Sequence, residues 1–495
     1  MRRLLRFTAK TILAVLVLIS ASAIGILIVH QCQLGRLHRL AQASPQNYVI
    51  RISPYFVLTD VHVIDGTGVE ERSNQNIVVH DGKIQWIGNS AEMPIQTGAQ
   101  VVDGKGETVI PGLVMMHEHL FTSAPSLRRP SLAQQSTIYP LLYLAEGVTT
   151  ARTAGSVDPA SDLRIKRRID RGDAVGPELF LTGPYLEGAP ALYPQMHALT
   201  GAEDATRMID QYSAEGFTSF KAYADITSAE LQAAITEAHA RSAKVTGHLC
   251  TITFREAADM GIDNLEHGLL VDTEFYSGKK PDVCPPIGAY LREYRDKLDV
   301  ASPEVVAVID DLIAHHVALT STLAVFEGEL GGRIPTWYQE REKSALTWQS
   351  WQFARMQQRA AAKFHAAILI SKAEQFEYSF ARRGGILIAG SDPTGDGSVL
   401  AGYADLRELE LLVEAGFTPV QAIQIATQNG ASFLGISDRA GTLEKGKQAD
   451  FVVIDGDPGQ NITDVRNVRT VYRLGIAYDT QKMLNAVDGI AGLSD

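Results

Sequence analysis

Short apolar, β-branched runs alternate with amphipathic helical stretches over residues 111–438 of the chain. This alternation is typical of βα units arranged around a parallel sheet. The expected strands lie near residues 113–120, 148–153, 179–183, 218–223, 244–249, 264–267, 318–323 and 386–392. Eight such units predict an α/β fold with a (β/α)8 TIM barrel over residues 111–438. The stretches 274–303 and 337–351 are longer than connections need to be, so we expect them to be insertions.

Both ends of the chain carry a different pattern, in which short β-branched runs contain or end in tight turns. Residues 55–64, 75–87 and 100–110 are punctuated by Asp-Gly pairs, and residues 441–457 and 465–479 have the same character. Asp-Gly within or between such runs is a hairpin signal. We therefore expect a small composite β-sandwich domain formed by residues 47–110 and 439–480, with the barrel inserted between its halves.

The N-terminus predicts a membrane anchor. Residues 1–10 carry four basic side chains, and residues 11–29 contain no charged side chain, which is long enough to cross a bilayer. We interpret residues 1–30 as an uncleaved signal anchor that forms a transmembrane helix, while Ala21-Ser22-Ala23 leaves a cleaved signal peptide as the alternative. The positive-inside rule then predicts a membrane-anchored protein whose catalytic domain lies on the extracytoplasmic side, the periplasm in a Gram-negative bacterium. Residues 31–46 form a connector and residues 481–495 a C-terminal tail.

Composition narrows the classes of function. The chain is 45% apolar and 21% charged, which is ordinary for a globular protein with a large core. Its net charge of -12, with no basic run after the N-terminus, argues against a nucleic-acid partner. The cysteines Cys32, Cys250 and Cys284 are too few and too scattered for a disulfide framework or a thiolate cluster, so we expect them to be small buried apolar residues.

Polar side chains close five of the eight predicted strands, where a barrel places its reactive groups. His117 and His119 are two residues apart on the first strand and therefore project from the same face. The other candidates end the fourth, fifth, sixth and eighth strands: Lys221, His248, His267 and Asp392. Imidazoles and a carboxylate without a nearby thiolate suit zinc and also accept manganese, cobalt or nickel.

Lys221 gives this set the ligands that two ions need. Burial near cations favours a neutral amine, which can combine with carbon dioxide to form a carbamate that bridges two metals. We expect His117, His119 and Asp392 to hold a buried ion and His248 and His267 a more exposed one. The carboxylated Lys221 and a hydroxide would bridge the two divalent ions, most simply zinc. Asp392 would accept the proton of the hydroxide and pass it to the leaving amine.

The chain resembles the amidohydrolase superfamily, in particular its imidazolonepropionase-like and prolidase-like branch of metallo-amidohydrolases, from about residue 55 to residue 479. The matching motifs are VIPGL before His117-Glu118-His119, EGVTT at 146–150, Lys221-Ala222-Tyr223, the two later histidines, AGSD at 389–392 and GTLEKGKQAD at 441–450. The resemblance implies the barrel with its composite β-sandwich and a binuclear site with a carboxylated lysine. It also implies hydrolysis of carbon–nitrogen bonds in small-molecule amides, often dipeptides or N-acyl amino acids.

Two departures from the family pattern concern the surroundings of the metals. The chain has Arg152-Thr153 where this branch commonly has Arg-Asp, which changes the groups behind the ligands. The glycine-rich, histidine-bearing loop after the third strand is replaced by residues 188–197, which leaves His197 as a weaker candidate for substrate binding. Tyr223 has the same parity as Lys221, and we expect it to reach the substrate as a binding or catalytic group, with packing as the alternative.

Two other functions compete with amide hydrolysis by two metals. A mononuclear deaminase or cyclic amide or lactone hydrolase usually lacks the lysine and carries a glutamate soon after the fifth-strand histidine, whereas here Leu249 and Cys250 follow His248. A catalytically silent, membrane-tethered binding protein would not need all six ligands. The aromatic cluster of the second insertion, which includes Trp337 and Trp351, is expected either at the pocket mouth or between subunits of a homo-oligomer.

Overall fold

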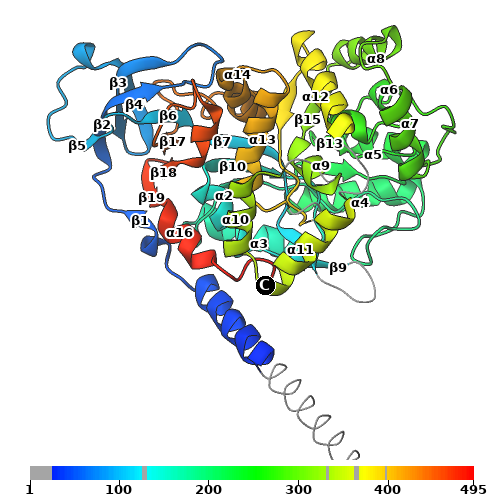
Figure 1. Ribbon diagram of the computed structural model, residues 1–495, viewed down its shortest axis with the longest axis horizontal. Coiled ribbons are helices and arrows are strands. Elements are labelled where there is room, and N and C mark those ends of the chain that lie inside the picture. Colours follow the sequence, from blue (N-terminus) through cyan, green and yellow to red (C-terminus); the bar gives the residue numbers. More distant parts are fainter. Residues whose placement is uncertain (1–24, 125–130, 331–333, 362–366, 396–398, 495) are drawn as a thin grey trace, which may run out of the picture.

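The computed structural model describes residues 25–494 except for 125–130, 331–333, 362–366 and 396–398. Strands from both ends of the chain, blue and red in Figure 1, lie together on one side of the molecule. The middle of the chain forms the larger part, where helices surround short strands. A helix over residues 25–41 extends away from this body.

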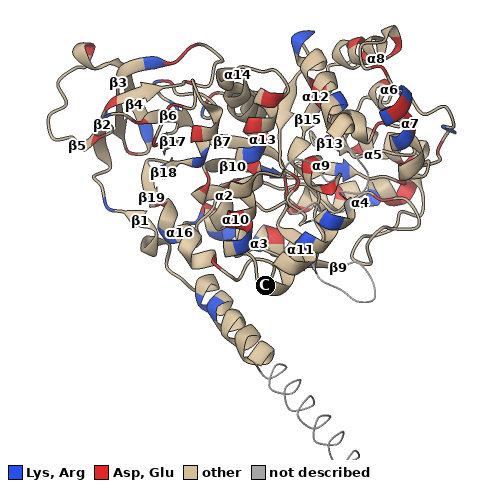
Figure 2. Cartoon of the chain, viewed as in Figure 1, with Lys and Arg blue, Asp and Glu red and all other residues tan. Residues whose placement is uncertain are grey.

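The sequence predicted a membrane-anchored, extracytoplasmic location, and this prediction is wrong because of the following structural finding. Among the residues that the structure describes, no helix is both long and apolar enough to cross a membrane. The described helix at 25–41 begins with four exposed aliphatic residues but continues through Gln31, Gln33, Arg36 and Arg39, so its hydropathy falls (Figure 2). Most of the predicted span, residues 11–24, lies outside the described part of the chain.

A single mixed sheet contains strands from both chain ends. Its path is β1-β19-β18-β17-β6-β2-β3-β4, with β5 paired to β2. The bounds are β1 Val49–Ile50, β2 Tyr55–Val63, β3 Arg72–His80, β4 Lys83–Asn89, β5 Gln100–Asp103, β6 Thr108–Pro111, β17 Phe451–Ile454, β18 Val468–Arg473 and β19 Ile476–Asp479. The two ends meet where β17 pairs antiparallel with β6, from Phe451 opposite Pro111 to Ile454 opposite Thr108. The expected sandwich is thus one continuous sheet, with apolar residues such as Phe56, Phe451 and Tyr472 gathered in its own core cluster.

Parallel strands follow one another in chain order through the larger part. They are β7 Leu113–Glu118, β10 Val148–Thr153, β11 Glu178–Phe180, β12 Ser219–Ala222, β13 Lys244–Gly247, β14 Asn264–Glu266, β15 Ala318–Ser321 and β16 Leu387–Ala389. The first three form one sheet and the other five a second. Isolated bridges of Thr182 with Ser219 and of Leu186 with Ala222 link the sheets on one side, and the Asp392 amide donates to the His117 carbonyl (2.9 Å) on the other. The fold is therefore TIM-barrel-like, but its strands are too short to pair in one closed ladder.

Helices connect these strands and cover their outer faces (Figure 1). Those that follow successive strands are α2 Tyr139–Ala145, α3 Pro159–Asp170, α4 Ala202–Glu215, α5 Ser228–Ala240, α6 Phe254–Asp259, α8 Pro303–Ala314, α12 Ala367–Arg382 and α13 Tyr403–Glu414. The remaining helices are α7 Ile287–Lys297, α9 Leu323–Glu329, α10 Thr336–Ala345, α11 Trp348–Ala361, α14 Pro419–Gln424, α15 Gly430–Leu434 and α16 Thr480–Val487. A small hairpin of β8 Phe121–Ala124 and β9 Ser131–Gln134 follows β7.

The two predicted insertions pack against the body of the protein. The first contains α7 and the second lies in α10 and α11. Trp337 packs under the guanidinium of Arg466, at 4.6 Å from the ring centroid, and the Tyr338 hydroxyl accepts a bond from the Leu400 amide (2.8 Å). Neither insertion supplies a described residue to the wall of the pocket presented below.

Cys250 and Cys284 form a disulfide, so the expectation that they are isolated apolar residues is wrong. The bond joins the segment just after His248 to the first insertion, across 34 residues of sequence. Lys279 strengthens the same junction, because its ammonium donates to the Thr251 carbonyl (2.5 Å). Sequence spacing alone cannot reveal such a pairing, since it depends on where the insertion folds back. Cys32 is free and exposed.

Replacing Cys284 with serine is expected to lower the stability of the protein without removing the fold. Disulfides of this kind contribute about 2–4 kcal/mol, chiefly by restricting the unfolded chain. Thermal unfolding of the parent and of Cys284→Ser should therefore differ under oxidising conditions and coincide in strong reductant. Cys32→Ser is the matched control and should unfold like the parent, while equal unfolding of all three proteins would contradict the assignment.

Candidate metal centre

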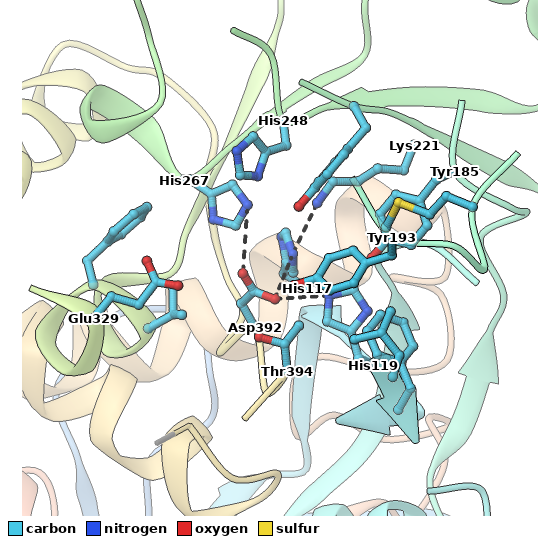
Figure 3. Close-up of a pocket in the computed structure, with 16 residues that line it drawn as sticks. His117, His119, Tyr185, Tyr193, Lys221, His248, His267, Glu329, Asp392 and Thr394 are labelled. Atoms are coloured by element: carbon cyan, nitrogen blue, oxygen red, sulfur yellow. Dashed lines mark hydrogen bonds and ion pairs between the residues drawn. The ribbon is translucent and has the colours of Figure 1, made fainter. Parts of the chain in front are cut away.

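All six predicted ligands line one pocket at the carboxyl ends of the barrel strands (Figure 3). The pocket occupies about 550 Å3, including space open to solvent. The side chains come from β7, β12, β16 and the residues just after β13 and β14: His117, His119, Lys221, His248, His267 and Asp392. The parallel strands bring them together because each strand ends at the same face of the barrel.

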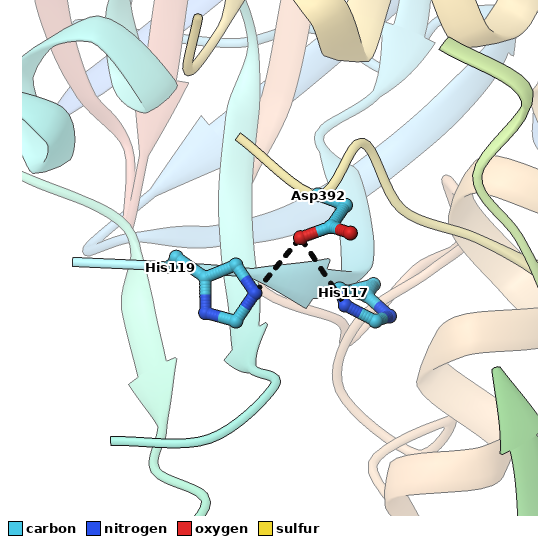
Figure 4. Close-up of side chains that lie close together, drawn as sticks. All are labelled: His117, His119 and Asp392. Atoms are coloured by element: carbon cyan, nitrogen blue, oxygen red, sulfur yellow. Dashed lines mark ion pairs between the residues drawn. The ribbon is translucent and has the colours of Figure 1, made fainter. Parts of the chain in front are cut away.

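His117, His119 and Asp392 form the tightest group (Figure 4). One nitrogen of each histidine and one carboxylate oxygen all lie within 4.8 Å of one another. Asp392 Oδ1 is 2.9 Å from His119 Nε2 and 3.5 Å from His117 Nε2. The two imidazoles project together because they alternate with the outward Glu118 along β7. Such a set of two nitrogens and one oxygen is suited to hold a divalent cation.

His248 and His267 form a second pair across the pocket. Their ring centroids are 4.5 Å apart, and the His267 ring is also 4.5 Å from that of His117. Lys221 lies between the two groups, with Nζ 3.1 Å from His117 Nε2 (Figure 3). His267 Nε2 is 3.8 Å from Asp392 Oδ2, so the carboxylate faces both groups with different oxygens.

The backbone at this face is unusual in three places. His267 and Asp392 have left-handed φ angles of 69° and 54°, which residues other than glycine seldom adopt. Backbone in such regions is concentrated at functional sites. Gly390 lies so close to β7 that a Cβ there would be 2.3 Å from the Cβ of His117. The AGSD sequence is therefore required for the close approach of β16 to the histidines.

A buried carboxylate behind the pocket orients His117. Glu266 Oε2 is 2.8 Å from His117 Nδ1, which leaves Nε2 directed at the pocket. Arg152 donates to Glu266 Oε1 (2.8 Å) and, through Nε, to the Met116 carbonyl (2.7 Å). Burial would raise the pKa of Glu266, but the positive charges of Arg152, His117 and Lys221 hold it well below its usual range. Sequence reasoning missed Glu266, although an acid between Leu265 and His267 on a buried strand is a signal for such a role.

Glu266→Gln is expected to weaken metal binding by about 10–100-fold, which is typical when a group that orients a metal-bound histidine is lost. The amide keeps the size of the side chain but cannot balance the Arg152 charge. Calorimetric titration of metal-free protein with zinc would measure the change. Glu178→Gln breaks a partly buried pair with Arg439 that does not line the pocket, and it serves as the control. An unchanged affinity in Glu266→Gln would contradict the role.

The electrostatics of the pocket favour neutral imidazoles and make the Lys221 ammonium easier to deprotonate. Burial lowers the pKa of His119 to about 4 and that of His248 to about 3, and it also depresses that of His267. Burial lowers the pKa of Lys221 to about 8, against the opposing effect of Glu266 and Asp392. Neutral nitrogen atoms are the forms that bind metals. At neutral pH the histidines are thus ready to act as ligands.

Tyr223 and His197 lie in different places. Tyr223 lines the pocket, with its ring 4.8 Å from that of His248. His197 lines a neighbouring cavity instead, where its Nε2 is 2.8 Å from Asp204. The substrate roles of both residues remain predictions, and only Tyr223 is adjacent to the candidate metal ligands.

The rest of the pocket wall is mainly aromatic and apolar and was not anticipated from the sequence. These residues come from the β8 hairpin, the loop after β11 and helix α9: Phe121, Leu132, Tyr185, Tyr193, Met196, Val325 and Phe326. Glu329 and Thr394 complete it. Loop positions of this kind carry no period that identifies them in a single sequence.

Comparison with known families gives the class of the protein. The amidohydrolase family model matches residues 108–477. The chain belongs to the amidohydrolase family, and the resemblance inferred from its motifs is confirmed. This also confirms the predicted class, a hydrolase acting on carbon–nitrogen bonds, at the level of the family.

Curated relatives match over short segments. Imidazolonepropionase from Shewanella sp. (strain W3-18-1) is 30% identical over 100 residues, which are 19% of this chain and 24% of the relative. Dihydroorotase from Elusimicrobium minutum (strain Pei191) is 30% identical over 109 residues, 22% of this chain and 23% of that protein. The matches thus span about a quarter of each of these relatives.

Solved structures match over most of the chain and support the fold. A putative prolidase from Bifidobacterium longum has a TM-score of 0.62 at 23% identity, covering 88% of this chain and 98% of that one. A Xaa-Pro dipeptidase with bound methionine in its active site has a TM-score of 0.63 at 20% identity, covering 86% and 100%. These likenesses confirm the overall fold.

Proposed function

We propose that the protein is a metal-dependent hydrolase that cleaves amide bonds in dipeptides or N-acyl amino acids with two divalent ions, zinc in the first instance. The observation that carries this proposal is the convergence of four imidazoles, one carboxylate and one buried lysine on a single pocket. His117, His119 and Asp392 would hold one ion, and His248 and His267 the other. Lys221, as a carbamate, would supply the ligand shared by both.

The chemistry of the donor set fits this arrangement. Lys221 is buried, and the hydrogen bond of its amine is made with a histidine nitrogen and not with a carboxylate. Burial favours the neutral amine, which is the form that combines with carbon dioxide to give a carbamate. His119 Nε2 and His117 Nε2 face Asp392, while the other nitrogen of His117 is occupied by Glu266. When bound, the ions would polarise the amide carbonyl and lower the pKa of a water molecule.

The protein's own residues then position the substrate and move the proton. Asp392 has one oxygen directed at His119 and the other at His267, so it is adjacent to both halves of the site. Burial would raise its pKa, but the neighbouring charge of His117 and the hydrogen bonds from His117 and His119 hold it low, and the group is an anion able to accept a proton. The proton would pass from Asp392 to the departing amine. Tyr223 is placed to donate a hydrogen bond to the substrate carbonyl or carboxylate.

Similar proteins support the choice of substrate class without deciding it. The solved structures named above include a putative prolidase and a Xaa-Pro dipeptidase, and each match covers nearly the whole length of that protein. The aromatic wall formed by Tyr185, Tyr193 and Phe121 offers an apolar surface to an acyl group or side chain beside the candidate ligands. A small amide with an apolar substituent fits both observations.

Metal analysis together with a substrate panel tests the proposal. The purified protein should contain about two zinc-class ions per chain and should cleave members of a panel of dipeptides and N-acyl amino acids. One ion per chain, with activity only on cyclic amides, lactones or amino-substituted heterocycles, would replace the proposal with the mononuclear alternative. Two ions with no cleavage of any amide would also overturn it.

A further inference from the structure

A second cavity adjoins the metal pocket. It occupies about 790 Å3, partly open to solvent, and lies between the start of helix α4, the loop after β10 and the loop that carries His197. Tyr185 and Met196 line both this cavity and the metal pocket, so together they form the wall between the two. A substrate that passes this wall would have one end at the candidate metal ligands and the other end in the second cavity.

Close contacts around Tyr185 fix the position of this wall. The Tyr185 ring packs directly on Gly155, where a Cβ would be 2.5 Å from the ring. Gly155 has a φ of 112°, so a side chain there would be strained as well as crowded. On its other faces the ring contacts those of Tyr223, at 5.0 Å between centroids, and Phe121, at 6.4 Å. The wall therefore has a fixed aromatic part, formed by Tyr185, and a flexible part, formed by Met196.

The charged groups that line the second cavity leave hydrogen-bond donors available to a ligand. Its acid, Asp204, is saturated: Oδ2 accepts from His197 Nε2 (2.8 Å) and from both the amide and the hydroxyl of Thr200 (3.0 Å each). Oδ1 accepts from Arg207 (2.9 Å). Within the described residues this is the one bond that Arg207 makes, and its guanidinium has five donors. The side chain is 67% exposed and lines the cavity, so its remaining donors are accessible to a ligand there.

The protein's own side chains, in contrast, supply little positive charge to the metal pocket. Among the described residues that line it, Lys221 is the one lysine or arginine, and the proposed carbamate would remove its positive charge. Asp392 and Glu329 add negative charge to the same wall. Dipeptides and N-acyl amino acids carry a carboxylate, and Arg207 outside this pocket offers it a charged hydrogen-bond partner that does not compete with the reacting amide for the ions.

We infer that the second cavity is an accessory subsite in which Arg207 binds the carboxylate at the far end of the substrate. The expected substrate is then an acylated dipeptide, or a similarly extended amide, that bears a free carboxylate. Its chain would pass between Tyr185 and Met196. This inference rests on the proposed amide hydrolysis. His197 belongs to the subsite as a residue that Asp204 orients, and not to the metal pocket.

The test compares N-acetyl-leucyl-glycine with its C-terminal carboxamide, using the full metal-loaded protein. In the parent the carboxylate compound should have a KM about tenfold lower, with a similar kcat, because a charged Arg–carboxylate bond acts on binding alone. Arg207→Gln should remove this difference by raising KM for the carboxylate compound only, and Arg207→Lys should retain part of it. Arg383→Gln removes the same charge from an exposed pair with Asp310 and lines neither cavity, so it should leave both compounds unaffected.

The outcomes separate this inference from the proposed function. If the parent cleaves both compounds with the same KM, or Arg207→Gln affects both alike, the subsite is wrong while amide hydrolysis stands. If the parent cleaves neither, calorimetric titration of the same two compounds still decides the subsite, and the substrate panel described above decides the proposed function. Tighter binding of the carboxylate compound that disappears in Arg207→Gln supports it, and equal binding overturns it.

Discussion

Replacing Lys221 with alanine is expected to reduce kcat/KM for amide cleavage by about a thousandfold, on the order of 4 kcal/mol of transition-state stabilisation. The same change should lower the metal content from about two ions per chain towards one, because the variant has no group to carry the bridging carbamate. Elemental analysis and steady-state kinetics on the same preparation measure both effects. A short carboxylic acid such as propionate, which fills the vacated space with a carboxylate, should restore part of the activity.

Lys244→Ala is the matched control, since this lysine begins the adjacent strand β13 and its side chain is largely outside the barrel. It should keep both ions and full activity. Reactivation of the metal-free parent by zinc should also depend on bicarbonate. It should proceed more rapidly at pH 8 than at pH 6. The reason is that burial lowers the Lys221 pKa to about 8, so the neutral amine that reacts with carbon dioxide increases as the pH rises towards that value. A fully active, two-metal Lys221→Ala protein would contradict the carbamate.

Asp392→Asn is expected to lower kcat by about a hundredfold to ten-thousandfold, the range associated with loss of a positioned proton-transfer group. KM should change much less, because the amide retains the size of the carboxylate and the aromatic wall is unaltered. The variant should also bind metal less tightly, since Asp392 has an oxygen close to both His119 and His267. Kinetics at saturating zinc separate the proton-transfer defect from the binding defect.

Asp438→Asn, an exposed change on the loop that leads to the β17 strand, is the control and should behave like the parent. Recovery of full kcat in Asp392→Asn by excess zinc would show that the residue acts only as a ligand. That result would overturn its role in proton transfer and leave the metal site intact.

The candidate ligands could be located from the sequence because each obeys a simple local rule. The spacing of His117 and His119 places them on one face of a strand, and Lys221, His248, His267 and Asp392 each close an apolar run. These rules require only that the runs be parallel strands of one fold, and the structure places all six residues in a single pocket. The metal-binding roles themselves await the experiments described above.

Features that depend on three-dimensional neighbours could not be predicted in the same way. Glu266 orients His117 from another strand, and Cys250 reaches Cys284 only because the insertion folds back over the barrel. The wall residue Tyr185 lies on a loop without periodic structure, and its position depends on contact with Gly155. The anchor prediction is contradicted because no helix among the described residues is both long and apolar enough to cross a membrane.

The closest group of candidate ligands joins the first and last strands of the barrel. Asp392 follows β16, and His117 and His119 lie at the end of β7. The Asp392 amide donates a hydrogen bond to the His117 carbonyl. During synthesis on the ribosome, the histidines therefore emerge long before the carboxylate that completes their set. Metal should bind this group only after the last barrel strand has docked beside the first. Binding of the ion would then be a late step in folding, and it would stabilise the contact between these two strands.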